Sequence, residues 1–262
     1  MKALGITVGG LPNLYSTGIR NRRLSVSFAS TSPSGPKTVG VTAPKIEYKP
    51  GVLDNLFLNL FRNKLVQEVG WDSKKPGYDG LIEVANRLMM KGTTNSHTIE
   101  ATVRILRSLF PPFLLELYKL LIAPLGGGKV AAVMVARVTA LTCQWLMGPC
   151  KVNSVDLPDG TSCNSGVYVE RCKYLEESKC VGICINTCKF PTQTFFKDHM
   201  GVPLLMEPNF ADYSCQFRFG VLPPLPEDDA VVKEPCLEAC PIASQRRMAA
   251  KNIGSGNLCH SQ

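Results

Sequence analysis

The chain has 262 residues, of which 45% are hydrophobic, 19% are charged and 11 are cysteines. This length allows one large domain or two small ones, and the apolar fraction excludes a disordered chain. The formal net charge is +8, but residues 1–46 hold six basic residues and no acid, which leaves 23 of the 29 basic residues against 21 acidic ones. A body with so little net charge argues against a surface that binds duplex nucleic acid.

Residues 1–46 have the composition of an organelle-targeting leader. They are rich in serine and threonine, contain glycine and proline throughout, and lack the uninterrupted apolar stretch of a secretory signal. We predict a chloroplast transit peptide that is cleaved between residues 30 and 46, the alternative being an ordinary solvated tail.

The rest of the chain divides by its cysteines, since all 11 lie between Cys143 and Cys259. We predict a helical apolar half over residues 47–149, a cysteine-rich metal-binding half over 150–245 and a flexible tail over 246–262. The expected fold class is α+β, with a helix-rich N-terminal half packed against a loop-rich C-terminal half.

Helical periodicity predicts the elements of the first half in order. A first helix over 53–65 shares one apolar face, made of Leu53, Leu56, Phe57, Leu60, Phe61 and Leu65. A second helix over 79–91 ends at Gly92. A third carries a stripe of Ile99, Val103, Leu106 and Phe110 and stops at two prolines, which cannot continue the hydrogen bonding. A fourth, over 113–121, is closed by Pro124.

Residues 129–147 form an apolar stretch about as long as a membrane span. Arg137 lies near its middle, however, and a central arginine costs about 2.5 to 3.5 kcal/mol on insertion. We therefore predict a buried helix of a soluble bundle. The preceding Gly126-Gly127-Gly128-Lys129 run is not a phosphate-binding loop, because valine follows the lysine where serine or threonine is needed.

The densest motif of the second half is Cys180-Val-Gly-Ile-Cys184-Ile-Asn-Thr-Cys188. A spacing of four places the three thiols on one side of a helix, and also on one face of an extended strand. Thiolates are soft ligands for iron, iron–sulfur clusters, zinc or copper(I). Lys179 and Lys189 bracket the motif and are expected to favour ionised thiols. Further candidate ligands are Cys172, Cys215, Cys236 and Cys240.

Three other interpretations of the cysteines compete with a metal site. Some of them are simply core residues, which we expect for Cys143. A structural zinc site normally has paired C-x-x-C knuckles, which are absent from the sequence. A disulfide framework suits secreted proteins and is at odds with this leader.

The three histidines offer little for a site. His97 and His260 are expected to face solvent, and His199 is a weaker candidate metal ligand because it follows the cysteine motif. The sequence has no nucleophile elbow, HExxH motif or dinucleotide-binding fingerprint, so ordinary hydrolase and nicotinamide chemistry has no support.

Several segments resemble the plant plastid β-carotene isomerase family of the strigolactone pathway. The similarity runs from about residue 48 to residue 240, and its most specific part is the cysteine-rich block over 171–191, supported by the segments at 78–82, 148–150, 201–203, 206–215 and 235–236. The resemblance implies an iron-dependent plastid enzyme that interconverts all-trans- and 9-cis-β-carotene. It also implies a carotenoid substrate, carotenoid cleavage enzymes downstream and a location in the plastid stroma. From the residues themselves, a helical half that closes around an apolar ligand or docks on a membrane surface is an open alternative, and peripheral contact with the plastid membrane is a further expectation.

The residues are compatible with such chemistry. Rotation about a polyene double bond requires a brief lowering of the bond order, by electron transfer, thiolate addition or Lewis-acid polarisation. We expect iron, as a single ion or an iron–sulfur cluster, to be held by Cys180, Cys184 and Cys188 together with Cys215, Cys236 or Cys172. The helices would supply an apolar groove for the hydrocarbon. A metal-stabilised scaffold that binds carotenoid without catalysis, and an electron-transfer protein, remain alternatives.

Overall fold

The structure is a computed structural model that describes residues 51–256, and side chains as far as Lys251. The described residues belong to one compact unit, Ile46–Gln262. The leader over 1–46, its cleavage site and His260 therefore lie outside the described residues and stay predictions.

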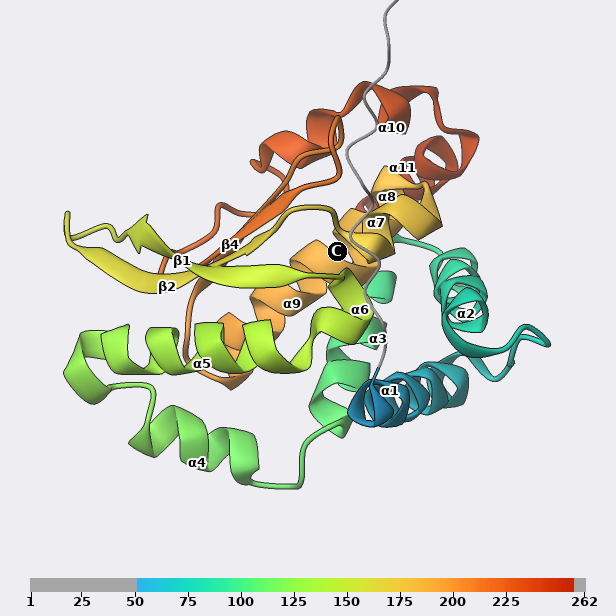
Figure 1. Ribbon diagram of the computed structural model, residues 1–262. Coiled ribbons are helices and arrows are strands. Elements are labelled where there is room, and N and C mark those ends of the chain that lie inside the picture. The colour runs from blue at the N-terminus through green and yellow to red at the C-terminus, as the bar shows by residue number, and fades with distance from the viewer. Residues whose placement is uncertain (1–50, 257–262) are drawn as a thin grey trace, which may run out of the picture. The chain divides into compact units, whose positions relative to one another are not determined.

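Helices precede and follow an antiparallel sheet along the chain (Figure 1). The first helices and short turns are α1 (Val52–Val69), α2 (Gly77–Lys91), α3 (Asn95–Ser108), α4 (Leu114–Leu121), η1 (Leu125–Gly128), α5 (Lys129–Thr142) and α6 (Gln144–Met147). Strands β1 (Cys150–Asp156) and β2 (Ser162–Val169) come next, and β3 (Leu204–Pro208) and β4 (Cys215–Phe219) complete the sheet. Between β2 and β3 lie α7 (Lys173–Ser178), α8 (Val181–Cys184), η2 (Ile185–Lys189), α9 (Phe190–Thr194) and η3 (Phe195–His199), and after β4 come η4 (Ala230–Lys233), α10 (Pro235–Ala239) and α11 (Pro241–Gly256).

The strands are ordered β1-β2-β4-β3 and are antiparallel throughout. Alternation along β4 turns Cys215, Phe217 and Phe219 to the buried face. Helix α5 covers this face of β2 with small residues such as Ala132 and Ala136, which allow a close approach. The predicted α+β class is confirmed. The second half is not loop-rich, however, because it contains the whole sheet and the helices after it.

The predicted helices are present, but the predicted faces are partly wrong. In α1 the buried residues are Leu58, Phe61, Leu65 and Val69, whereas Leu53, Leu56 and Leu60 are exposed. In α4 only Leu115 is buried. Both helices carry apolar residues nearly all round, so periodicity alone does not say which stripe meets the core.

The stretch predicted as one buried bundle helix is instead a helix lying on the sheet. It breaks at Cys143 into α5 and α6. A search of the described helices for possible membrane spans finds one by length and composition, Leu125–Thr142, of which a third is buried. Its inner half packs against β2, and its outer half, including Val138 and Leu141, is exposed.

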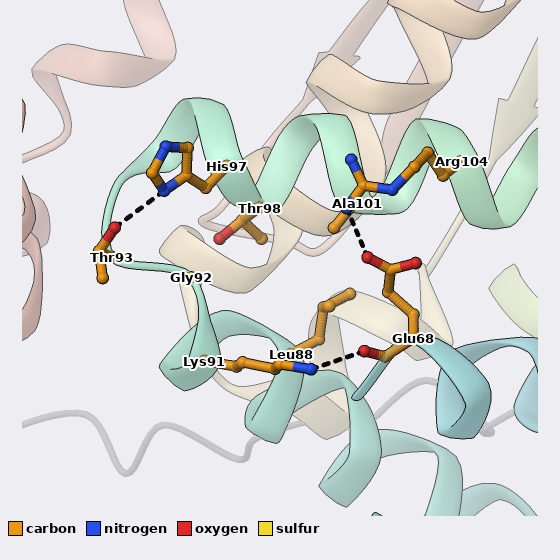
Figure 2. Close-up of a pocket in the computed structure, with 9 residues that line it drawn as sticks. All are labelled: Glu68, Leu88, Lys91, Gly92, Thr93, His97, Thr98, Ala101 and Arg104. Atoms are coloured by element: carbon orange, nitrogen blue, oxygen red, sulfur yellow. Dashed lines mark hydrogen bonds and ion pairs between the residues drawn. The ribbon is translucent and has the colours of Figure 1, made fainter. Parts of the chain in front are cut away.

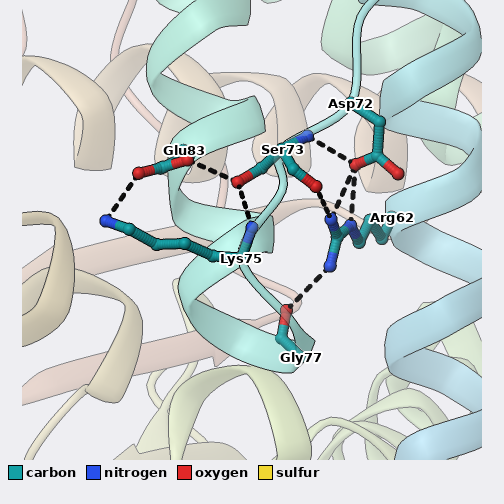
Figure 3. A network of polar contacts seen from close by, with 6 residues as sticks. All are labelled: Arg62, Asp72, Ser73, Lys75, Gly77 and Glu83. Atoms are coloured by element: carbon teal, nitrogen blue, oxygen red, sulfur yellow. Dashed lines mark hydrogen bonds and ion pairs between the residues drawn. The ribbon is translucent and has the colours of Figure 1, made fainter.

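A polar network fixes α1 to the turn before α2 (Figure 3). The Arg62 guanidinium donates to Asp72 Oδ1 at 2.7 and 2.9 Å and to the carbonyl of Ser73 at 2.7 Å. The Ser73 hydroxyl donates to Glu83 Oε2, and Glu83 Oε1 lies 2.6 Å from Lys75 Nζ. The network thus satisfies the polar groups of a turn that lacks regular secondary structure.

A buried ion pair attaches the segment after β4 to the helices. Lys189 Nζ lies 2.5 Å from Asp229 Oδ2, and both side chains are almost inaccessible to solvent. Asp229 Oδ1 also accepts the N–H of Val231 and so caps η4.

Arg246 attaches helix α11 to the junction of α2 and α3. Its guanidinium is buried and donates to the carbonyls of Met89, Gly92 and Thr94 and to the side chains of Asn95 and Thr98. Residues 246–256 were predicted to lie in a flexible tail. They form part of α11 instead. Arg246 attaches this helix by donating to the carbonyls of Met89 and Gly92 at the end of α2, and to the carbonyl of Thr94, which also accepts the N–H of Thr98.

We expect Arg246→Met to lower the free energy of unfolding by about 2 to 4 kcal/mol, because it leaves buried carbonyls without a donor. Arg247→Met is the matched control, since its exposed guanidinium makes one hydrogen bond, to the carbonyl of Leu237. Urea denaturation followed by circular dichroism measures both. Equal midpoints for the two variants would contradict this role.

We expect Lys189→Met to destabilise the protein by about 3 to 5 kcal/mol, because Asp229 would stay buried without its cation. The double variant Lys189→Met/Asp229→Asn keeps the η4 cap but removes the charge. It should therefore recover most of the lost free energy in the same denaturation experiment. If the double variant is no more stable than Lys189→Met, the loss of stability does not come from the unpaired charge of Asp229.

Candidate functional site

Four cysteines meet where β2, β4 and the helices after β2 come together. Val169, at the end of β2, pairs with Cys215, at the start of β4. Cys172 follows β2 and donates its backbone N–H to the carbonyl of Tyr213 at 2.7 Å, which keeps it beside Cys215. Cys184 and Cys188 come from α8 and η2. We call Cys172, Cys184, Cys188 and Cys215 the inner thiol cluster.

Electrostatics shows that the inner thiols are neighbours. Burial raises the pKa of Cys184 well above its usual value, and Cys188, Cys172 and Cys215 raise it further. Burial likewise raises the pKa of Cys215, with contributions from Cys172 and Cys188. Like charges shift each other's pKa only over short distances in a protein interior.

Two predicted ligands are separated from the inner cluster. Cys180 precedes α8 in an extended conformation, at φ −143° and ψ 114°, and is not part of the helical stripe. A Cβ placed on Gly182 would lie 3.7 Å from Cys180 Sγ and 3.8 Å from Leu237 in α10. Burial and then Glu234 raise the pKa of the exposed Cys236, and Cys180 and Cys240 raise it further. Cys180, Cys236 and Cys240 therefore form a second group, the outer thiols.

The backbone explains why Cys184 and Cys188 stay together. From Val181 to His199 the chain follows a helical path in which η2 and η3 are π turns, and the N–H of Phe190 bonds to Ile185 five residues earlier. Pro191 has no N–H, and its ring crowds the carbonyl four residues before it, so the helix widens there. In a wider turn four residues advance less far round the axis, which keeps both thiols on one side.

Lys189 acts on the thiols in the direction that the sequence predicted, but burial has the larger effect. Burial raises the pKa of Cys184 and Cys215, and Lys189 lowers it by a smaller contribution. The Lys189 ammonium is also paired with Asp229. The inner thiols are thus neutral in the absence of a bound cation.

Tyrosine and threonine side chains border the inner cluster. The hydroxyl of Tyr174 donates to Thr187 Oγ1 at 2.8 Å, and Thr187 donates to the carbonyl of Ile183 at 2.7 Å. Burial raises the pKa of Tyr174, and Cys188, Cys184 and Cys172 add to this. Sequence reasoning missed these residues. The position of Thr187 inside the cysteine motif is a signal that could have identified it, whereas no such signal marks Tyr174.

Tyr78 approaches the same cluster from α2. Its hydroxyl donates to the carbonyl of Leu146 at 2.6 Å, and Lys173 Nζ lies 3.9 Å from its ring centroid. Burial and then Cys172 raise its pKa well above the usual value.

The remaining candidates lie outside the inner cluster. Cys143 packs against the main core as expected and contributes to the raised pKa of Cys188, which places it close to the inner cluster. Burial raises the pKa of its neighbour Cys150 to about 12. Burial and Arg107 lower the pKa of His199, and no cysteine is among the groups that influence it. His97 is exposed on α3, where its ring bonds to Thr93.

The donor set of the inner cluster suits a soft metal. Its four side chains are cysteines from separate elements that converge in an apolar environment, and thiolates are ligands of iron, zinc and iron–sulfur clusters. Among residues 51–251, no group of three or more histidine, cysteine or acidic side chains has the spacing that a single ion requires. The four cysteines that would hold a metal are therefore adjacent without forming a tight single-ion shell.

Two clefts of the described surface lie away from these thiols. One of about 190 Å³ lies between α2 and α3 and is lined by Lys91, His97, Arg104 and Glu68 among others (Figure 2). The other, of about 310 Å³, lies around the Pro111-Pro112 turn. Neither is lined by a cysteine, and neither has the shape of the long apolar groove that the sequence predicted.

Comparison with known proteins finds a family model that matches part of the chain. Residues 145–228 match the family model described as "Beta-carotene isomerase D27-like, C-terminal". This range contains all four inner thiols but neither Cys236 nor Cys240. No solved structure matches the chain.

Two relatives are similar over most of the chain, and both are named "Beta-carotene isomerase D27, chloroplastic". The protein from Medicago truncatula is 35% identical over 194 residues, which cover 74% of this chain and 75% of the relative. The protein from Arabidopsis thaliana is 38% identical over 168 residues, which cover 64% of this chain and 62% of the relative. Identity at this level over three quarters of a relative shows that the chain belongs to the β-carotene isomerase D27 family.

Proposed function

We propose that this chain is a cis–trans isomerase of carotenoids that interconverts all-trans- and 9-cis-β-carotene and supplies strigolactone biosynthesis. The observation that carries the proposal is the extended identity to two proteins named β-carotene isomerases. The inner thiol cluster supports it, because it lies entirely inside the part that matches the family model. Carotenoid cleavage enzymes would then consume the product.

We further propose that iron, as a single ion or within an iron–sulfur cluster, would be held by the inner thiols. Four convergent cysteines supply the right ligand type. The outer thiols are not required in this proposal, which therefore differs from the ligand set expected from spacing.

Such a centre supplies one-electron or Lewis-acid chemistry that can lower the order of a double bond. The protein's own side chains provide an environment that suits this chemistry. Met206, Phe217 and Phe219 belong to the same core and exclude water. Tyr174 and Thr187 hold the first turns of the helix through their paired hydroxyls, which leaves the hydroxyls no free proton to direct at an apolar substrate.

A plastid location is part of the proposal. The relatives are named chloroplastic, and the leader of this chain has the composition of a transit peptide. A carotenoid substrate is a lipid-soluble hydrocarbon, which also agrees with a plastid membrane as its source.

The activity is tested by incubating anaerobically purified protein with all-trans-β-carotene and resolving the isomers by liquid chromatography. We expect Cys184→Ser to abolish formation of the 9-cis isomer, because a serine hydroxyl does not replace a thiolate ligand. Cys163→Ser, on β2 and outside both thiol groups, is the matched control and should keep wild-type turnover. Full activity of Cys184→Ser would refute the role of the inner cluster.

Metal analysis together with electron paramagnetic resonance tests the ligand set. We expect Cys172→Ser and Cys215→Ser each to lose most of the bound iron, whereas Cys180→Ser and Cys236→Ser keep it. If Cys180→Ser and Cys236→Ser lose the iron whereas Cys172→Ser and Cys215→Ser keep it, the outer thiols are the metal ligands. A protein that purifies with zinc alone would contradict iron-dependent catalysis.

The alternative is a non-catalytic carotenoid-binding scaffold, in which the inner thiol cluster has a purely stabilising role. Protein with full metal occupancy that binds β-carotene but leaves the isomer ratio unchanged would establish this alternative.

A further inference from the structure

The helices α4 and α5, with the residues that flank α4, expose ten large apolar side chains. Over residues 113–141 the exposed ones are Phe113, Leu114, Leu117, Leu120, Leu121, Leu125, Val130, Met134, Val138 and Leu141. Three of them stand out, since Phe113, Leu120 and Leu141 are 75%, 71% and 80% exposed. We call this set the α4–α5 face. Scattered exposed leucines need no explanation, but a series of this length on two consecutive helices does.

Packing shows that this face can lie on a bilayer but not cross it. The inner half of α5, including Ala132 and Ala136, is buried against β2. A spanning helix would have to leave the sheet and expose its core to water. Figure 1 shows α4 and α5 running in opposite directions, with α5 between α4 and the sheet. A half-buried apolar helix with an apolar outer side is the arrangement of an interfacial anchor.

The charges around the face are mainly positive. Between residues 113 and 141 there are three basic residues and one acid, Glu116. Lys129 is paired with Asp159, but exposed Arg137 has no carboxylate within ion-pair distance among the described residues. Arg107, exposed beside Phe113 in the cleft around the Pro111-Pro112 turn, likewise has no ion-pair partner in the described part of the chain.

These charges distinguish a lipid surface from a second copy of the chain. A twofold interface would bring the same mainly positive patch against itself, with Glu116 as the one acid that residues 113–141 supply. An anionic bilayer instead supplies phosphate groups for the guanidiniums and hydrocarbon for the leucines. We propose that the α4–α5 face docks the protein on the surface of an anionic membrane. This proposal does not depend on the isomerase activity.

A local fluorescence probe tests the proposal in the full chain. Leu120→Trp places an indole on the face, and Leu222→Trp places one at an equally exposed leucine of the loop after β4. With vesicles of phosphatidylglycerol and brominated phosphatidylcholine, we expect the Leu120→Trp emission to shift to shorter wavelength and to be quenched. Leu222→Trp should change as little as the unsubstituted protein. Because the probe is local, membrane binding by the basic leader does not imitate this result.

Three outcomes would overturn the proposal. The first is quenching of Leu120→Trp no greater than that of Leu222→Trp. The second is a shift that grows with protein concentration without lipid, which would assign the face to a second copy. The third is an emission already at short wavelength in the monomer, which would mean that another segment of the chain covers the face.

Charge substitutions give an independent measurement. We expect Leu120→Glu/Leu141→Glu to weaken vesicle binding in flotation by about tenfold or more, because two apolar side chains no longer enter the bilayer. Leu222→Glu/Leu225→Glu is the control, since both leucines are exposed and lie outside the face. Circular dichroism checks that both variants fold. Equal loss of binding in the two double variants would contradict a specific docking face.

Discussion

The thiol chemistry of this protein depends on one packing constraint, which is the meeting of the adjacent ends of β2 and β4 with the widened helix over Val181–His199. The strand register holds Cys215 beside the end of β2, and a backbone hydrogen bond holds Cys172 beside Tyr213. The helix, which follows β2 in the chain, brings Cys184 and Cys188 to the same place. A shift of one residue in the pairing of β4 would turn Cys215 to the solvent face and dissolve the cluster.

Burial has two consequences for this cluster. It excludes water, which suits chemistry on a hydrocarbon, and it opposes ionisation of thiols that a metal would need as thiolates. Lys189, which follows the cysteine motif, does not resolve this conflict, because burial changes the pKa of Cys184 and Cys215 more than Lys189 does. Ionisation of the inner thiols would thus be coupled to metal binding, as is general for cysteine sites formed in a folded core.

Two buried cations hold the periphery in place around this core. Lys189 attaches the segment after β4, and Arg246 attaches α11 to the helices that precede the sheet. The segment after β4 also packs through Val231 and Leu237, which form a small hydrophobic cluster with Ile185 and Phe190. The exposed α4–α5 face lies outside these attachments.

Local patterns made the helices predictable. Prolines and glycines set the ends of the helices before the sheet, and periodicity indicated each one, because these signals act within a few residues along the chain. The faces were less predictable. The stripe of Leu53, Leu56 and Leu60 looked like core and is exposed, because α1 is apolar on more than one side and only its neighbours decide which side is covered.

Composition and local patterns were sufficient to predict the α+β class, the positions of the helices and the concentration of thiols in the second half. The spacing of four residues grouped Cys180 with Cys184 and Cys188, but the backbone before α8 is extended and directs Cys180 toward α10. Which thiols meet depends on long-range packing, because Cys172 and Cys215 reach the cluster through strand pairing between distant segments, and no local pattern encodes that contact.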